Sequence, residues 1–334
     1  MLIVPLTTTP LILFASLPGL AMAVGDEAPG PDSRQPAPVW QWQYQAAKSL
    51  ALTGPQGIVW RLNFAKDQDK VFFDPLGTVH GQSLTWNGPS DHPWHHGLWF
   101  SWKMINGVNY WEFDASGKPA GTTELIDAQV TCPGQTDRPR DHATVVLHFA
   151  YHPAGPRPAV MKETVTLTIE PPRPDGSYRI DWHQRSTALV DVQLDRTPPP
   201  GRPGGVAYGG YGGLSYRGAQ QLTHVTMTDS QGRTNLAVHR QRARWLDASG
   251  LVDGQAAGVA LLDHPSNPRH PTPWFIVRTP KPGHPFWYTN PALLCWKPLT
   301  LAAGKTLELR YRIVVHEGRC DRVWLDDQWQ TFGH

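Results

Sequence analysis

Hydrophobic and polar residues alternate with a period of two along much of this chain. The alternation is plainest at 164–169, which reads Thr-Val-Thr-Leu-Thr-Ile, and at 307–313, which reads Leu-Glu-Leu-Arg-Tyr-Arg-Ile. Such a pattern is typical of a β-strand with one face in a core and the other toward solvent or a groove. Alternating or β-branched runs predict strands at 39–44, 58–64, 98–102, 124–131, 143–151, 160–170, 178–187, 222–228, 258–263 and 307–316.

The segments between these runs carry turn residues, so we expect the strands to be antiparallel. At 171–176 the chain reads Pro-Pro-Arg-Pro-Asp-Gly, in which proline fixes φ and glycine accepts a positive φ. The 334 residues include 33 Pro and 31 Gly, which disfavour long helices. Only 320–332 has the spacing of a short helix, and no repeat of fixed period favours a propeller or a solenoid. We therefore predict an all-β fold: a large antiparallel two-sheet sandwich with a short C-terminal helix, formed by a single domain at 39–334.

The first 23 residues predict a signal peptide. An apolar run ends at Ala-Met-Ala, which suits cleavage after residue 23. No Lys or Arg precedes the run and prolines interrupt it, so an uncleaved anchor is the alternative, although a membrane span needs roughly 20 apolar residues. Residues 24–38 are small, acidic and Pro-rich, which predicts a flexible leader. We expect a periplasmic or secreted protein with no membrane contact after cleavage.

Charge and cysteine content exclude some classes of protein. With 30 Lys and Arg against 28 Asp and Glu, the net charge of +2 is too small for the basic surface that binds nucleic acid. The 3 cysteines allow at most one disulfide, for which Cys295 and Cys320 are the expected pair. The 15 Trp and 15 His are unusual, because these residues stack on rings, transfer protons and bind metals.

The densest functional signal lies at 91–99, which reads Asp-His-Pro-Trp-His-His-Gly-Leu-Trp. Pro93 imposes extended or turn geometry on His92, which places His92 and His95 on a loop that enters the strand at 98–102. Asp91 could orient an imidazole for proton transfer, or the histidines could form part of a metal shell. Alternatively, these histidines cap backbone groups at a tight corner.

A second cluster at 263–274 reads Asp-His-Pro-Ser-Asn-Pro-Arg-His-Pro-Thr-Pro-Trp and repeats the Asp-His-Pro start. Its prolines make the loop stiff, which lowers the entropy of holding several polar groups toward one ligand. The alternative is a rigid connection whose polar groups bind one another. We expect the two Asp-His-Pro segments to meet in one partly dry cleft.

Two other segments are candidates for lining such a cleft. The glycine-rich run at 209–213 contains Tyr211 and lacks the Lys-Ser/Thr ending of a phosphate loop. It predicts either close backbone approach to a ligand between tyrosines, or a β-bulge or flexible hairpin. An Asn-Gly turn at 106–107 precedes a strand in which Glu112 lies among aromatic residues, an environment that would raise its pKa. A surface glutamate is the alternative.

Together, the runs at 91–99, 106–107, 212–214, 263–271 and 309–312 resemble an exported bacterial family of unknown function, the DUF6807 type, often labelled methane oxygenase PmoA-like. The resemblance spans about residues 39–323. The family commonly reads His-Pro-His-His-Arg-Gly-Leu-Trp at the first site, whereas this chain has Trp94 and His96 in place of a His and the Arg. We therefore assign proton transfer to His92 and His95.

The resemblance implies a galactose-mutarotase-like supersandwich and a setting among sugar oxidoreductases and glycan-degrading systems. A membrane-bound methane monooxygenase subunit needs several membrane spans, and no run after the first segment approaches that length. Methane oxidation is therefore not expected.

We expect an exported carbohydrate-active enzyme with a His-rich cleft that acts on a sugar or glycoside. No facing pair of carboxylates stands out, which favours epimerase or lyase chemistry over hydrolysis. A non-catalytic glycan-binding protein and a His-ligated metalloenzyme are the alternatives; we expect a small carbohydrate as the partner, and no cofactor or metal. The expected catalytic residues are Asp91, His92, His95, Glu112, His264 and His270. The expected substrate-binding residues are Trp94, Tyr211, Asn267, Arg269 and Trp274.

Overall fold

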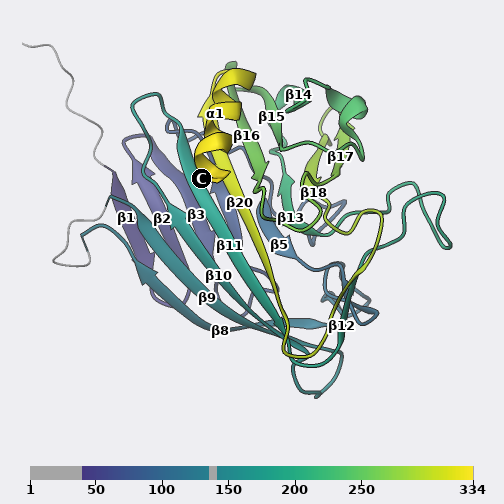
Figure 1. Ribbon diagram of the computed structural model, residues 1–334. Helices are drawn as coiled ribbons and strands as arrows, with labels where there is room; N and C mark the ends of the chain where they lie inside the picture. Colours follow the sequence, from purple (N-terminus) through teal and green to yellow (C-terminus); the bar gives the residue numbers. More distant parts are fainter. Residues whose placement is uncertain (1–39, 135–140, 334) are drawn as a thin grey trace, which may run out of the picture. The chain divides into compact units, whose positions relative to one another are not determined.

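The computed structural model describes residues 40–134 and 141–333 and arranges their strands in two large antiparallel sheets and one small sheet (Figure 1). The first sheet has the order β1 (Gln41–Gln45), β2 (Ser49–Gly54), β3 (Gly57–Asn63), β4 (Phe72–Leu76), β5 (Leu98–Ser101), β13 (Gly213–Arg217), β18 (Phe286–Pro291) and β17 (Trp274–Thr279). The second has the order β14 (Thr223–Asp229), β15 (Trp245–Val252), β16 (Gln255–Asp263), β20 (Thr306–Glu317), β11 (Tyr178–Ala188), β10 (Met161–Ile169), β9 (Ala143–His152) and β8 (Thr122–Thr131). The small sheet contains β19 (Leu299–Leu301), β12 (Val192–Asp195), β6 (Met104–Ile105) and β7 (Val108–Asn109).

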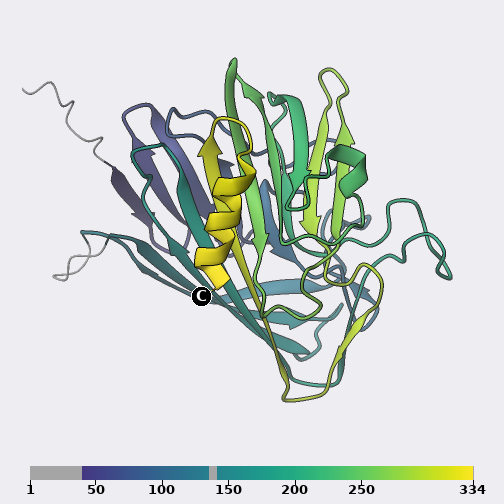
Figure 2. The same ribbon diagram turned by 45° about the horizontal axis from the view of Figure 1, so that its top comes forward.

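The two large sheets enclose one hydrophobic core, and the turned view shows them as two layers (Figure 2). Strand β10 shows how the sequence produces this arrangement. Met161, Val165 and Leu167 alternate along it and are buried, whereas Lys162 between them is exposed. Because side chains alternate across a strand, this pattern buries one face only. The predicted all-β fold, a large antiparallel two-sheet sandwich, is confirmed.

The first sheet also carries aromatic residues on its outer face. Along β17, Trp274 belongs to the sandwich core, whereas Phe275 belongs to a second cluster on the opposite face. Strand β18 repeats this division, with Trp287 in the core and Tyr288 in the second cluster. Trp99 of β5 joins the second cluster, which forms the floor of the site described below.

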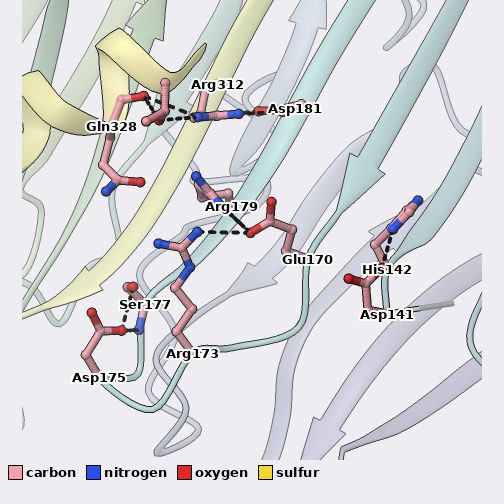
Figure 3. Close-up of polar contacts among 11 residues, drawn as sticks. Asp141, His142, Glu170, Arg173, Asp175, Ser177, Arg179, Asp181, Arg312 and Gln328 are labelled. Atoms are coloured by element: carbon pink, nitrogen blue, oxygen red, sulfur yellow. Dashed lines mark hydrogen bonds and ion pairs between the residues drawn. The ribbon is translucent and has the colours of Figure 1, made fainter.

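The α-helix α1 (Arg322–Gly333) covers part of the outer face of the second sheet. Leu325 is fully buried in a cluster with Leu262 of β16 and Val314 of β20. Arg312 of β20 donates to both carboxylate oxygens of Asp181, at 2.7 and 2.8 Å, and to the carbonyl oxygen of Gln328 at 3.2 Å (Figure 3). The predicted C-terminal helix is thus confirmed, and its contacts explain why both faces of β20 are buried.

Several strands were not predicted from the sequence, including β2, β4, β13, β15, β17 and β18. The expected pairing of Cys295 with Cys320 is wrong. Both are free thiols, and they lie in separate apolar clusters on different sheets. The expected signal peptide at 1–23 and the leader at 24–38 lie outside the described residues. Within the described residues, no helix combines the length and the apolar character that crossing a membrane requires.

Candidate active site

A cavity of about 480 Å³ opens above the outer aromatic face of the first sheet. Strands β17 and β18 supply its floor, and the loop before β5 supplies its imidazoles. Its lining residues are His92, Trp94, His95, Glu112, Tyr208, Tyr211, Phe275, Val277, Phe286 and Tyr288.

The two imidazoles form a stack on this floor. The rings of His92 and His95 are stacked with centroids 4.7 Å apart, and His95 stacks in turn on Tyr288 at 5.3 Å. Phe286 meets the His92 ring edge-on at 4.8 Å. Nδ1 of His95 is buried and has no hydrogen-bond partner within the described chain. Because buried polar atoms are normally paired, this nitrogen is the kind of group that a bound molecule completes.

Both imidazoles are held in the uncharged form near neutral pH. Burial lowers the pKa of His92 below its usual 6.5, and the Asp91 carboxylate opposes this shift only in part. Burial lowers the pKa of His95 further, well below 6.5, and the nearby His92 and Arg217 add to the effect. An uncharged imidazole can accept a proton, so the pair is suited to general base catalysis.

Asp91 contacts His92, and Arg217 in turn binds Asp91. Oδ2 of Asp91 lies 3.2 Å from Nδ1 of His92, while the Arg217 guanidinium donates to both Asp91 oxygens at 3.1 Å. The Arg217 side chain is fully buried and lies 3.6 Å from the centroid of Phe286. A carboxylate at Nδ1 favours a proton on that nitrogen, which leaves the lone pair on Nε2.

Glu112 lies at the cavity edge in a network of three donors. Its Oε1 accepts a hydrogen bond from the Tyr211 hydroxyl at 2.7 Å and pairs with Lys103, and its Oε2 accepts from Asn109 at 2.7 Å. Burial alone would raise the pKa of Glu112, but Lys103, Tyr211 and Asn109 together lower it below 4.5. The expectation of a raised pKa was therefore wrong. Glu112 is an anionic hydrogen-bond acceptor and not a proton donor.

The second Asp-His-Pro segment lies elsewhere, against β20 and α1. The His270 ring stacks on Trp329 of α1 at 5.8 Å, and the His264 ring meets Phe332 edge-on at 4.8 Å. Among the described residues, the cavity lining includes no member of this segment. The expectation that both segments share one cleft is corrected, because the helix and β20 hold the second one.

The polar groups of the second segment bind one another and the backbone. Asp263 accepts hydrogen bonds from Asn267 at 2.8 Å and the backbone of Thr272 at 3.0 Å, and it pairs with His270 at 2.8 Å. Arg269 donates to three backbone carbonyls, of Leu293, Lys297 and Pro298. The segment at 263–274 is therefore a rigid connection whose polar groups bind one another and the backbone, which was the alternative to a ligand-binding loop.

Of the other expected substrate-binding residues, two line the cavity and one is buried in the core. Trp94 and Tyr211 line the cavity, whereas Trp274 is fully buried and donates through Nε1 to the carbonyl of Ala243. The expectation that the Trp274 ring stacks on a sugar is corrected by its burial in the core.

The glycine-rich run at 209–213 leads into β13. Gly212 and Gly213 have φ of 152° and 105°, and the backbone N–H of Gly212 donates to the Asn290 side chain.

Sequence reasoning missed Lys103, Arg217 and the aromatic floor. Phe275, Phe286 and Tyr288 belong to strands that are apolar on both faces, and such strands lack the alternation that signals a groove. The signal that was available is the run of consecutive aromatic residues at 286–288, which indicates that something covers both faces of the strand. Nothing in the sequence near Arg217 points to Asp91, its partner 126 positions away, and nothing in the sequence alone pairs Lys103 with Glu112. Across residues 40–134 and 141–333, no three His, Cys, Asp or Glu side chains form a group able to hold a metal ion.

These features define a class: an all-β, two-sheet protein with an aromatic cavity that holds two uncharged imidazoles and one carboxylate. A family model described as "Family of unknown function (DUF6807)" matches residues 50–330, and the chain belongs to this family. That description names no activity and carries no methane-oxygenase label. No curated protein matches the sequence.

Solved structures that are similar to parts of this chain share little sequence with it. The alpha-galactosidase from Lactobacillus brevis is 11% identical with a TM-score of 0.40, over 86% of this chain and 39% of its own. A putative kojibiose phosphorylase from human microbiome is 7% identical with a TM-score of 0.27, over 71% of this chain and 29% of its own. The Slr1438 protein from Synechocystis is 10% identical with a TM-score of 0.30, over 88% of this chain and 100% of its own. The chain thus spans less than half of the first two proteins, and these similarities assign no activity to it.

Proposed function

We propose that this protein is a carbohydrate-active enzyme that transfers protons on a sugar, as an epimerase or a lyase does. The supporting observation is the pair of stacked, uncharged imidazoles, one of them backed by Asp91 and Arg217, inside an aromatic cavity. Sugar rings offer apolar C–H faces to aromatic side chains, and they offer hydroxyl groups to polar ones.

In this proposal His92 is the general base. Its Nδ1 faces Asp91, so Nε2 accepts a proton from a substrate C–H or O–H group. The His92 imidazolium then returns this proton to the substrate carbon or to a leaving oxygen. His95, stacked on His92, is the second proton carrier: its uncharged ring accepts the proton of a substrate hydroxyl and gives the same proton back when the reaction closes. Asp91, which Arg217 holds in place, stabilises the imidazolium that forms on His92.

Glu112 positions the substrate by accepting hydrogen bonds from hydroxyl groups. Its lowered pKa keeps it ionised, and Tyr211 beside it provides a ring and a hydroxyl at the cavity wall. Among the described residues, Glu112 is the only carboxylate in the lining. Ordinary glycosidases use two carboxylates, so epimerase or lyase chemistry fits this site better than hydrolysis.

The test measures proton transfer directly. Purified protein is incubated with a panel of sugars, glycosides and oxidised glycosides in deuterated water, and exchange of substrate protons is followed by NMR while absorbance reports any unsaturated product. His92→Gln is expected to slow the reaction by about 10²- to 10⁴-fold. His264→Gln, which alters the histidine of the second Asp-His-Pro segment, is the matched control and should react at the wild-type rate. Equal rates in His92→Gln and wild type, or no exchange across the panel, would contradict the proposal.

The aromatic lining also suits a glycan-binding protein without turnover. Trp94, Tyr211 and Phe286 provide partly exposed rings that bind sugars whether or not a reaction follows. Under this alternative, sugars bind the cavity without exchange or product, and His92→Gln keeps the wild-type affinity. Export of the protein is a further part of the proposal, and it rests on the predicted signal peptide alone.

A further inference from the structure

A second, larger cavity of about 580 Å³ lies on the other side of the loop that carries the imidazoles. Adjacent residues divide between the two cavities, since His95 lines the first and His96 lines the second. The same division occurs at the next segment, where Glu112 faces the first cavity and Phe113 the second. The two cavities therefore share a wall.

Aromatic rings form the edge of this wall. Trp94 lines the first cavity and meets Phe113 of the second edge-on, with centroids 6.0 Å apart. Both side chains are half-buried, so each keeps part of its surface exposed at the boundary between the cavities. A ligand that extends from one cavity to the other would cross these two rings.

The second cavity is more polar than the first, and its charges are mixed. Lys66 and Lys118 line it together with Asp67, Asp69 and Glu124, so no single sign of charge dominates. Such a lining offers hydrogen-bond donors and acceptors to hydroxyl groups and does not single out a phosphate or another anion.

The back of the second cavity is held rigidly. Nδ1 of His96 lies 2.8 Å from the Asn87 side-chain oxygen, and Nε2 lies 3.0 Å from Asp69. The His96 ring also stacks on Phe72, with centroids 4.9 Å apart. A wall whose side chains are already fixed loses little entropy when it binds a ligand.

We propose that the second cavity is a subsite for the neighbouring sugar unit of an oligosaccharide whose reacting unit occupies the first cavity. This inference rests on the proposed function of the first cavity. It makes the substrate an oligosaccharide or polysaccharide, with the Trp94 and Phe113 rings beneath the linkage.

The experiment measures affinity against chain length. Mono-, di- and trisaccharides of several linkage series, such as glucose, cellobiose and cellotriose, or xylose, xylobiose and xylotriose, are titrated into the full-length protein by calorimetry. The NMR signal of His92 reports whether the first cavity is occupied. In the series that binds, the trisaccharide should bind at least about tenfold more tightly than the monosaccharide, because each net hydrogen bond contributes roughly 2- to 12-fold.

Two variants test where this gain arises. The double variant Lys66→Ala and Lys118→Ala removes two charged groups of the second cavity, and Phe113→Leu removes the ring at the wall. Each should reduce the ratio of trisaccharide to monosaccharide affinity severalfold, whereas Lys305→Ala, at an exposed turn away from both cavities, should keep the wild-type ratio. Circular dichroism confirms that each variant is folded.

The outcomes separate this inference from the proposed function. If monosaccharides perturb His92 but longer sugars bind no more tightly, or the gain persists in both variants, the subsite is wrong and the first cavity remains a sugar site. If no sugar perturbs His92, the proposed function fails and the subsite fails with it.

Discussion

At the scale of single residues, the pKa of His92 is set by opposing effects. Burial lowers it, the Asp91 carboxylate raises it, and Arg217 adds to the lowering. Asp91→Asn removes the negative charge with little change of shape, so we expect the pKa of His92 to fall further below 6.5. The acid limb of any pH–rate profile that depends on His92 should move to lower pH in the same variant.

The measurement is an NMR titration of the imidazole signals. His264 serves as the internal reference, because it lies in the other Asp-His-Pro segment and its main neighbouring charge is Arg310. An unchanged or raised pKa of His92 in Asp91→Asn would show that the carboxylate does not act on this imidazole as the geometry indicates.

Residues of this site were predictable only where the partners are close in sequence. Asp91, His92 and His95 occur within one short segment, and the proline between them already indicated a loop. Arg217 could not be predicted, since it reaches Asp91 across 126 positions only after β5 and β13 have paired. Lys103 and Glu112 lie on either side of the short β6–β7 hairpin, whose pairing was not predicted, so the pKa of Glu112 was predicted in the wrong direction.

At the scale of elements, strand β10 carries one inward polar residue. Glu163 is buried in the sandwich, where its carboxylate accepts hydrogen bonds from Trp102, Tyr151, Gln184 and Ser186. Burial raises its pKa from 4.5 to about 7, although these donors oppose the shift. Between those pH values the folded state binds a proton that the unfolded state has lost.

Glu163 therefore makes the free energy of unfolding decrease as the pH rises. Its contribution is full below pH 4.5 and is lost as the pH rises to about 7. In Glu163→Gln we expect this decline, roughly 1–3 kcal/mol, to disappear from the pH dependence of urea unfolding. Glu308→Gln is the matched control, because the pKa of Glu308 is lowered and its titration lies below this window. A decline that persists in Glu163→Gln would assign it to other groups.

Helix α1 offers a matched pair of substitutions at neighbouring positions. Leu325 is fully buried against the second sheet, whereas Val323 on the same turn is 73% exposed. Leu325→Ala should lower the free energy of unfolding by about 2–5 kcal/mol because it leaves a cavity, and Val323→Ala should change it by less than about 0.5 kcal/mol. Urea denaturation of both variants measures the difference, and equal effects would mean that the helix does not pack as the structure shows.

The elements found from sequence are those with one buried face. Strands β9, β10 and β11 alternate cleanly, and their predicted bounds differ from the observed ones by one residue or less at each end. Strands β17 and β18 are buried on both faces, by the sandwich core and by the aromatic cluster, so their sequences carry no period of two. The site lies over the strands that this pattern could not identify.

At the scale of the whole molecule, the two Asp-His-Pro segments have the same sequence start and different surroundings. The first lies over an open cavity with an unpartnered imidazole nitrogen, and the second is packed against α1 with its carboxylate fully engaged. Three shared residues do not determine a role, since the neighbours that decide it come from distant strands and from the helix. We expect the first segment to serve chemistry and the second to serve stability.

A pair of variants separates these roles. Asp263→Ala removes the acceptor for Asn267, His270 and the backbone of Thr272, so the free energy of unfolding should fall by about 2–4 kcal/mol while kcat/KM of the folded protein stays within about twofold of wild type. His95→Gln should lower kcat/KM by about 10²- to 10⁴-fold, with a smaller loss of stability than Asp263→Ala. Urea unfolding and turnover are measured on both proteins under the same conditions. If Asp263→Ala instead lost turnover at full stability, the second segment would have to reach the substrate, and the division of the molecule into a catalytic loop and a supporting loop would be wrong.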